Sequence, residues 1–529
     1  MDLLAELART DLDPALLAQV RALLRAKDEA LAASDASATL LERKEQLLKA
    51  AETKIAALTL ELAYHRRIRF AHKSEALPAG QRDLFDETWD IDLAAMQAEL
   101  DAQADALARD KPKAKRPRAG RQPLPDHLER IEHRHEPASC ECGQCGAALH
   151  LIGEDVSEQL DVEPARFFVH RHIRPQYACR ACETVTAAAV APAIIDGGMA
   201  APGLLAWLAT SKYVDHLPLY RIEQIGARQQ VPLPISTTSD WLGKVGVALQ
   251  PLADRLSELL RLRPTLHADE TPVRQLDPGQ GKTKRAYLWA YRSNSLDEGP
   301  PIVVFDYQGG RAGAHAQTFL GAWRGHLMVD DYAGYKALFG NGVTELACLA
   351  HLRRKFFDLH AANGSPVAAE ALRRIAQLYA IERQAGDVAA DVRLALRQQQ
   401  AKPLLLQCQQ WMSATRLTVA DGSGTAKAID HALKRWPALL RYAGSGTLPI
   451  DNNPVENAIR PIAIGKKNWL FAGSERAGHR AAAIQSLFAT AKLNGLDPHR
   501  WLADTLEALP TCPNSQIDSL LPFKKSNGA

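Results

Sequence analysis

The chain is poor in cysteine, in net charge and in long apolar runs. Only 8 of its 529 residues are Cys, too few for a disulfide scaffold, and 64 Lys and Arg against 61 Asp and Glu leave a formal charge of +3. A globally basic chain is excluded, so contacts with nucleic acid must come from local clusters. The composition, 46% hydrophobic and 24% charged, is globular, and the length predicts three or four domains.

Targeting and membrane signals are also lacking. Acidic residues stand where a signal peptide needs a basic region, and no cleavage site follows. The most apolar stretch, residues 187–210, contains Asp196, two consecutive glycines and two prolines, which make a poor spanning helix. We therefore expect a soluble protein of a reducing, cytoplasmic compartment, associated with the nucleoid and without a membrane partner.

Residues 1–80 have a helical pattern. Leu41, Leu48, Ile55 and Leu62 recur at intervals of seven, and charged residues occupy the other faces. This stripe predicts either a helix packed on its own chain or a coiled coil that joins two copies into a homo-oligomer. Residues 81–125 are first acidic and then basic, with Pro and Gly, which is typical of a linker; as a solvated tether, it would also add phosphate contacts beside a DNA-binding module.

Two C-x-x-C pairs predict a zinc-binding β module over residues 126–190. Cys142 and Cys145 form one pair, and Cys179 and Cys182 form the other, so four thiolates would close a tetrahedral structural zinc site. Cys140 is a spare or alternative ligand. Strand-like runs between the pairs indicate an inserted hairpin. We expect the module to present basic side chains to DNA, namely Arg166, Arg171, Arg174 and Arg180.

The rest of the chain predicts a helical region and a catalytic core. Residues 191–262 have helical patterns that fit a helix-turn-helix or any small bundle. Over residues 263–490, three strands are followed by alternating helices and strands, which is the element order of a ribonuclease H-like α/β core. A helical insertion is expected at about 365–442, and residues 491–529 form a C-terminal tail region. The predicted fold class is multidomain α+β.

Carboxylates stand where two of the core strands are expected to end. Asp269 follows the strand 265–268, and Asp330 follows the strand 327–329. If these strands are neighbours, both carboxylates emerge at one edge of the sheet, where repulsion favours a hard divalent cation such as Mg²⁺ or Mn²⁺ between them. Asp331 competes with Asp330 for the second position. Glu456 fits as a third acid, although its place in the first turn of a helix also suits a capping residue.

Several ordered motifs resemble the transposases of insertion-sequence family 66, over nearly the whole chain. They are Asp269–Val273 (DETPV), residues 329–335 (VDDYAGY), 348–356 (CLAHLRRKF), 451–461 (DNNPVENAIRP) and 465–473 (GKKNWLFAG). The resemblance implies an Asp-Asp-Glu triad on a ribonuclease H-like core, and the matching positions are Asp269, Asp330 and Glu456. At the positions that Ala71 and Asp331 occupy in this chain, members of the family often have Gly.

The resemblance implies a DNA transposase that cuts and joins the ends of an insertion sequence by two-metal phosphoryl transfer. Its partners would be the double-stranded DNA of terminal repeats and target, with accessory proteins of the same element. Candidate DNA contacts are His351, Arg353, Arg354, Lys355, Arg460, Lys466, Lys467 and Trp469. A non-catalytic zinc-containing regulator and a general metal-dependent nuclease are the alternatives. Terminal-repeat sequence, target preference, oligomer number and activity of this copy stay open.

Overall fold

The computed structural model describes residues 129–136, 141, 144–163, 166–277 and 282–524, with scattered residues between 19 and 128. The chain divides into two compact units, Met1–Arg67 with Met96–Pro117, and Ile68–Ala95 with Arg118–Ala529. In the first unit the described residues, including 51–55, are helical, and Leu48 and Ile55 are exposed. Leu41 and Leu62 lie outside the described residues, so the coiled coil stays a prediction. Everything below concerns the second unit.

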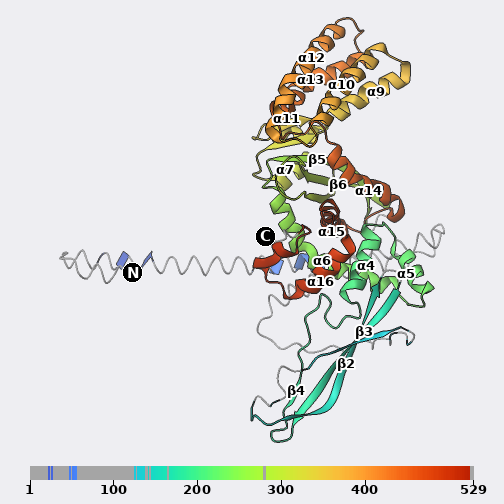
Figure 1. Ribbon diagram of the computed structural model, residues 1–529, viewed down its shortest axis with the longest axis vertical. Coiled ribbons are helices and arrows are strands. Elements are labelled where there is room, and N and C mark those ends of the chain that lie inside the picture. The colour runs from blue at the N-terminus through green and yellow to red at the C-terminus, as the bar shows by residue number, and fades with distance from the viewer. Residues whose placement is uncertain are drawn as a thin grey trace. The chain divides into compact units, whose positions relative to one another are not determined.

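A long β-hairpin dominates the smaller sheet of this unit. Strand β2 (Leu149–Glu163) pairs antiparallel with β3 (Arg166–Cys179), while β1 (Arg130–Arg134) pairs parallel with β3, and β4 (Val185–Ala187) pairs with its end. The hairpin is the predicted insertion between the two cysteine pairs. Figure 1 shows β2 and β3 reaching away from the helices that follow them.

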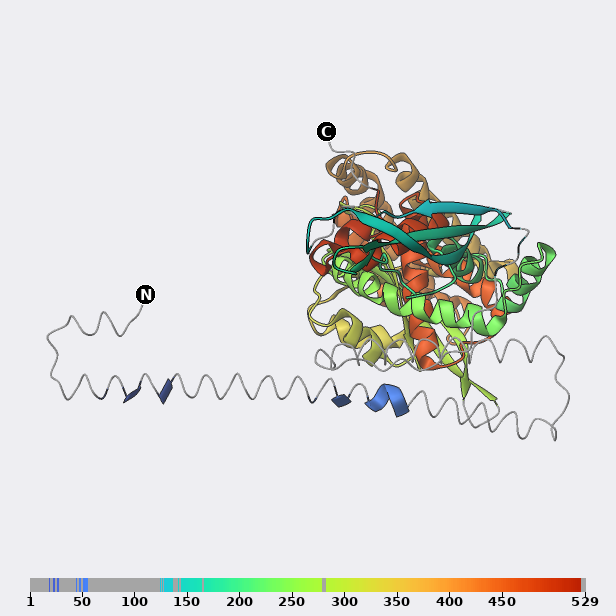
Figure 2. The same ribbon diagram turned by 90° about the horizontal axis from the view of Figure 1, so that it is seen from below.

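Three helices connect the two sheets: α4 (Pro202–Tyr213), α5 (Leu219–Arg228) and α6 (Ile235–Leu260). The small sheet is joined to this layer by main-chain bonds, because Leu160 N donates to Met199 O and Ala201 N donates to Leu160 O. The C-terminal region is folded: α15 (Glu475–Leu493) packs on α6, and α16 (Pro498–Ala508) packs on α4. Figures 1 and 2 both show these helices (red) beside α4 and α6 (green). Two 3₁₀ helices, Leu509–Thr511 and Asn514–Leu520, follow.

The larger sheet has the order β7-β6-β5-β8-β9. Strands β5 (Thr265–Asp277), β6 (Lys282–Ser293) and β7 (Val303–Gln308) are antiparallel neighbours, whereas β8 (His326–Val329) and β9 (Thr344–Ala347) run parallel to β5. Short helices separate the later strands: α7 (Gly313–Leu320), η2 (Ala333–Tyr335) and α8 (Lys336–Phe339).

Alternating side chains of this sheet enter two cores. Ile302, which precedes β7, and Val304 in β7 face α6, while Val303 and Phe305 face α14 (Asn453–Trp469) and α15. Strand β7 is an edge strand, and α15 satisfies its free N–H groups: Phe305 N donates to Ser486 Oγ at 2.7 Å and Val303 N donates to Thr490 Oγ1 at 3.0 Å. Hydroxyl groups on a covering helix thus replace the missing neighbouring strand.

Helices between β9 and α14 form a bundle with its own core, gathered beyond one end of the larger sheet (Figure 1). They are α9 (Leu349–Asn363), α10 (Pro366–Gln384), α11 (Ala390–Leu396), the π-helical turn η3 (Arg397–Ala401), α12 (Lys402–Arg416), α13 (Gly424–Leu440) and η4 (Arg441–Gly444). Arg397 is fully buried there, and its guanidinium pairs with Glu382 at 2.6 Å and donates to Leu448 O at 2.9 Å. Because every donor of a buried guanidinium needs an acceptor, this residue ties α10 to the segment that leads into α14. No helix in the described part of the chain is long and apolar enough to cross a membrane.

Candidate active site and cysteine cluster

Two acidic residues lie just past the paired part of the neighbouring strands β5 and β8 of the larger sheet. Strand β8 pairs with β5 in parallel up to the pair His267↔Met328, so two further steps along both strands lead to Asp269 and Asp330. The sequence predicted that β5 ends before Asp269, and that boundary is wrong: pairing with β6 continues to Asp277. It is β8 that ends at Val329, so Asp269 lies on β5 at the point where its neighbour stops.

Asp269 is half-buried, and burial raises the pKa of its carboxyl group from 3.8 to about 7, with the charge of Glu270 as the next cause. The charges of Asp330 and Glu456 raise this pKa further, so both carboxylates lie within electrostatic reach of Asp269. One hydrogen bond, donated by Glu270 N to Asp269 Oδ1 at 2.9 Å, has the opposite effect and lowers the pKa of Asp269. The three acids predicted from sequence are therefore close enough for Asp330 and Glu456 to influence Asp269, and a cation would relieve their repulsion.

Asp330 and Asp331 differ in their surroundings. Asp330 accepts a bond from Tyr332 N at 2.8 Å and influences Asp269. Asp331 turns to α13, where Arg435 donates to its Oδ1 at 2.8 Å and His431 lies 3.3 Å from its Oδ2. The pKa of Asp331 is lowered: burial opposes this, and the Arg435 guanidinium outweighs it. Asp331 thus joins the core to the helical insertion, and Asp330 is left for the acidic site.

Glu456 is carried by the first turn of α14, and the residue before that helix fixes its place. Asn452 is fully buried; its Nδ2 donates to Ala268 O at 2.9 Å, and its Oδ1 lies 3.1 Å from His267 Nδ1. Its own N–H bonds to Cys348 Sγ at 3.1 Å. The two residues that precede Asp269 therefore hold the start of the helix that carries Glu456.

The capping interpretation of Glu456 does not match its contacts. The Asn452 side chain makes no capping bond to α14, and Glu456 Oε1 is buried with no hydrogen-bond partner in the described structure. That oxygen lies 3.5 Å from His351 Nδ1, which is also buried and unpartnered. A buried carboxylate oxygen that lacks a hydrogen-bond donor and lies within electrostatic reach of Asp269 suits a hard cation such as Mg²⁺ or Mn²⁺.

Cys348, His351 and Glu456 also place one ligand atom each within 4.8 Å of one another. Burial raises the pKa of the Cys348 thiol to about 12, so the sulfur stays protonated at neutral pH. Without a metal, the Cys348 sulfur is therefore a neutral hydrogen-bonding group of the fold. Cys348 acts as the acceptor that fastens α14 to the start of α9.

Glu270 was missed by the sequence interpretation. Its side chain is 1% exposed, and it accepts bonds from Arg311 Nε at 2.7 Å and from Tyr335 OH at 2.8 Å. Neighbouring residues of a strand point to opposite faces, so Glu270 anchors the loop before α7 while Asp269 faces the other acids. The sequence shows that Asp269 and Glu270 are adjacent acids. Only their hydrogen-bond partners in the structure distinguish the role of one from that of the other.

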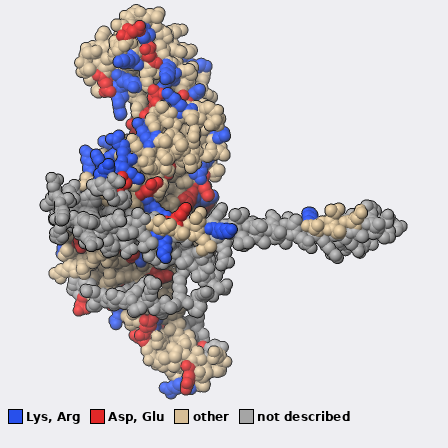
Figure 3. Space-filling view, turned by 180° about the vertical axis from the view of Figure 1, so that it is seen from behind, with Lys and Arg blue, Asp and Glu red and all other residues tan. Residues whose placement is uncertain are grey.

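The candidate DNA contacts fall into two groups. Exposed ones are Arg353, Arg354, Lys355, Arg460 and Lys467. The others have partners within the fold: His351 faces Glu456, Lys466 Nζ donates to Pro272 O at 2.7 Å, and Trp469 lines an apolar pocket with Phe471. A separate pocket beside the start of α14 is lined by Arg353, Arg354 and Arg383 with Asn453, and by several apolar side chains. In Figure 3, Lys and Arg side chains are numerous on this part of the molecule, with acidic side chains among them.

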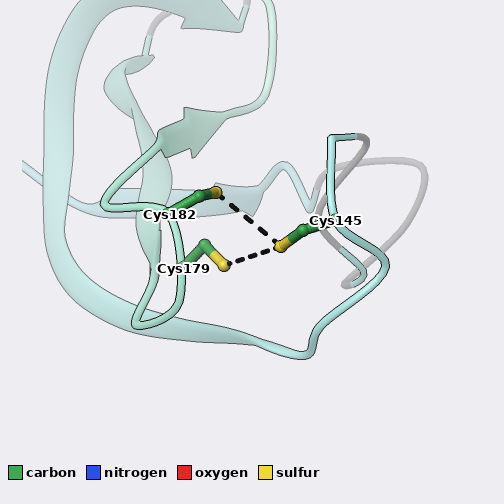
Figure 4. A group of neighbouring side chains, drawn as sticks. All are labelled: Cys145, Cys179 and Cys182. Atoms are coloured by element: carbon green, nitrogen blue, oxygen red, sulfur yellow. Dashed lines mark hydrogen bonds between the residues drawn. The ribbon is translucent and has the colours of Figure 1, made fainter.

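Three of the four paired cysteines converge in the small sheet. Cys145 Sγ lies 3.4 Å from Cys179 Sγ and 3.8 Å from Cys182 Sγ, and the three side chains point toward one another (Figure 4). Sulfurs on one tetrahedral zinc ion lie about 3.8 Å apart, given zinc–sulfur bonds of about 2.3 Å. Gly146 has φ +72°, as a tight turn after Cys145 requires. Cys140 and Cys142 lie outside the described residues, so the fourth ligand stays a prediction.

The basic side chains of this sheet are largely neutralised on the sheet itself. Arg166 pairs with Glu129, Arg171 pairs with Glu132 and Arg174 pairs with Asp155. Arg180 is exposed. Exposed ion pairs are weak, so phosphate could replace these carboxylates, and DNA contacts of the four arginines stay a prediction.

Comparisons with known proteins match these features. Family models match as follows: "Transposase IS66 family" over residues 197–480, "zinc-finger binding domain of transposase IS66" over 139–183, "IS66 C-terminal element" over 486–523 and "Transposase C of IS166 homeodomain" over 57–132. The first match includes Asp269, Asp330 and Glu456. The second match includes the five cysteines between residues 140 and 182.

Curated relatives resemble the chain over most of its length. "Uncharacterized protein y4qI" of Sinorhizobium fredii is 38% identical over 518 residues, which cover 94% of each chain. "Uncharacterized protein y4jD" of the same organism is 39% identical over 76% of this chain and 81% of its own. "Uncharacterized protein y4hP" is 32% identical over 90% of this chain and 88% of its own.

Proposed function

Since the chain belongs to the IS66 family of transposases, we propose that it cuts and joins the ends of an insertion sequence by metal-dependent phosphoryl transfer. The proposed catalytic residues are Asp269, Asp330 and Glu456. The proposal rests on two contacts: the parallel register of β5 with β8, which leads to Asp269 on one strand and to Asp330 after the other, and the bonds of Asn452 to His267 and Ala268 at the start of the helix that carries Glu456. Burial, Glu270 and, to a smaller extent, the two other acids raise the pKa of Asp269 to about 7, in keeping with this arrangement. Perturbed carboxyl groups that gather in one place are a mark of functional sites.

We propose that the larger sheet and its helices form a ribonuclease H-like core. Three antiparallel strands are followed by two strands parallel to the first, and the first strand is central in the order β7-β6-β5-β8-β9. This arrangement supports the proposal because it brings the middle of β5 and the end of β8 together. The bundle α9–α13 would then be an insertion between the fifth strand and the last catalytic helix.

The chain's own residues would hold and orient the reacting groups. Bound Mg²⁺ or Mn²⁺ would activate a water or a 3′-hydroxyl and stabilise the leaving oxygen. Asp269, Asp330 and Glu456 would hold the ions as carboxylates. Asn452 keeps Glu456 in place through its bonds to β5. His351, 3.5 Å from Glu456, would orient that carboxylate rather than contact phosphate.

DNA is the proposed partner, and the arginine-lined pocket beside α14 is its proposed contact next to the acids. Arg353 and Arg354 project from α9, and Arg383 projects from α10, around Asn453 of α14. Three guanidinium groups at one opening would bind backbone phosphate without reading sequence. Zinc at the cysteine cluster would be structural, because four protein ligands leave no position for water. Oligomerisation through the N-terminal helix stays part of the proposal.

A strand-transfer assay tests the proposal. Purified protein is incubated with end-labelled terminal-repeat DNA, a target plasmid and Mg²⁺, and cleaved and joined products are measured separately. Asp269→Asn, Asp330→Asn and Glu456→Gln should each remove both products while DNA binding persists. Asp358→Asn, which changes an exposed acid of α9, is the matched control and should leave both unchanged.

Each other outcome points to a different function. Cleavage without joining would favour a general nuclease, and DNA binding without either product would favour a regulator. Normal activity of Asp269→Asn would remove that residue from the site, and loss of activity in Asp358→Asn would show that the assay reports folding.

A further inference from the structure

Four histidines lie on one face of the small sheet, far from the cysteine cluster. His133 and His135 come from β1 and the residue after it, and His170 and His172 come from β3. Their rings form a row in which neighbouring centroids are about 5 Å apart: His135 stacks on His172, and His172 stacks on His133. His170 and Cys179 are nine positions apart on β3, which corresponds to roughly 30 Å along a strand.

The ring nitrogens of these histidines meet in pairs. His133 Nε2 lies 2.8 Å from His170 Nδ1, and His135 Nε2 lies 3.0 Å from His172 Nδ1. Two imidazoles that share one metal ion hold their nitrogens about 3.3 Å apart, given metal–nitrogen bonds of about 2.0 Å in a tetrahedral arrangement. The His133–His170 pair therefore needs to open by only about 0.5 Å to admit an ion.

The carboxylate of Asp161 contacts one histidine of the first pair, His170. His170 Nε2 lies 2.6 Å from Asp161 Oδ2, so that nitrogen carries the proton and Nδ1 keeps its lone pair toward His133. Asp161 itself is confined, because its carboxylate lies against Gly203 at the start of α4 with no room for a Cβ between them. A histidine that donates its second nitrogen to a fixed carboxylate is the usual arrangement around protein-bound transition metals.

We propose that His133 and His170 bind a transition-metal ion, of the Zn²⁺ or Ni²⁺ class, that fastens β1 to β3. Imidazole suits these ions, and water would complete the coordination. The ion would secure an edge strand that is otherwise held by a ladder of five residue pairs.

The second pair serves as an internal comparison. His172 Nε2 lies 3.2 Å from Gln159 Oε1, so an amide takes the place that Asp161 has in the first pair. An amide raises the basicity of a ligand less than a carboxylate does, and His135 is exposed. The His133–His170 pair is therefore the primary site, and substitution of His135 should have the smaller effect.

Titration of the full-length protein with Ni²⁺ tests the site. The protein is prepared with zinc, which the cysteine cluster is proposed to hold, and calorimetry measures Ni²⁺ binding in parallel with zinc content, so that displacement of zinc is detected. Asp161→Asn should weaken Ni²⁺ binding about 10- to 100-fold. His133→Ala and His170→Ala should each weaken it at least as much, while His150→Ala, at an exposed histidine of β2, should not change it. Retained zinc shows that each variant has kept its fold.

Hydrogen exchange gives a second readout. Ni²⁺ should slow exchange of the amides of β1 in the wild-type protein and should not do so in His133→Ala. Ni²⁺ affinity unchanged in both His133→Ala and His170→Ala, or lost only on substitution of His135, would overturn the proposal. The proposed transposase activity does not depend on either result.

Discussion

The perturbed carboxyl group of Asp269 predicts that a catalytic substitution will stabilise the metal-free protein. In the folded chain the pKa of this group is about 7, against 3.8 for an ordinary aspartic acid. The folded state therefore binds a proton that the unfolded state has already released. Its stability falls as pH rises from about 4 to about 7, and the whole loss is present above pH 7.

The size of the effect follows from the same values. The difference between 3.8 and about 7 corresponds to about 4 kcal/mol at about 1.4 kcal/mol per pKa unit. Water entry and side-chain motion reduce this figure, so we expect Asp269→Asn to raise the free energy of unfolding by about 1–3 kcal/mol at pH 8. Asparagine has no charge to bury, and its oxygen still accepts the bond from Glu270 N. At pH 4 the two proteins should have nearly equal stability.

The measurement is native-state hydrogen exchange of the β5 and β6 amides at pH 5, 6.5 and 8, because a chain of several domains does not unfold in one step. The buffer contains no Mg²⁺ and no chelator, so that zinc stays bound. Adding Mg²⁺ at about 100 times its Kd should stabilise the wild-type protein by about 2.7 kcal/mol and the variant much less. The exposed-residue control Asp358→Asn should match the wild type throughout.

Two results would contradict this reasoning. A stability difference that is the same at every pH would mean that Asp269 is not the titrating group. A variant less stable than the wild type at pH 8 without Mg²⁺ would mean that the three carboxylates do not repel one another in the folded protein.

Other substitutions test how the acids are held and how DNA is bound. Asn452→Ala removes two bonds to β5 and should lower the rate of DNA cleavage about 100-fold, because Glu456 shifts, while DNA affinity measured by gel shift changes little. His351→Ala should raise the Mg²⁺ concentration for half-maximal cleavage about 10-fold, whereas His351→Gln should restore part of it, since an amide can also orient Glu456. Arg354→Ala should lower the slope of log affinity against log salt by about 0.9, the contribution of one phosphate contact. An unchanged cleavage rate would show that Asn452 does not position Glu456. An unchanged Mg²⁺ requirement would contradict the role of His351, and an unchanged salt slope would contradict a phosphate contact of Arg354.

The strands and their succession along the chain could be predicted, because a strand depends on local alternation of apolar and polar residues. One strand boundary could not be predicted. The sequence interpretation ended the strand-like run at Ala268. The strand continues because β6 pairs with it along its whole length, and Pro272 lies beyond the end of β8, where β5 has no second neighbour until Ala472 bridges Gln275. Proline is tolerated at such one-sided positions. The boundary thus depends on the length of a different strand, which no local pattern of β5 contains.

The contacts of Glu456 likewise could not be predicted from the sequence. A capping residue and a metal ligand look the same in the first turn of a helix, and what separates them here is the bonding of Asn452 to residues about 185 positions earlier. The same contact explains how a large insertion is accommodated. Glu456 follows Asp330 by 126 positions, yet its location is set by His267 and Ala268 on β5. The helices in between attach to the core through Asp331 and Arg435 of α13, and they also attach to the segment before α14 through Arg397 and Tyr379. The third acid is therefore held both from β5 and from the insertion.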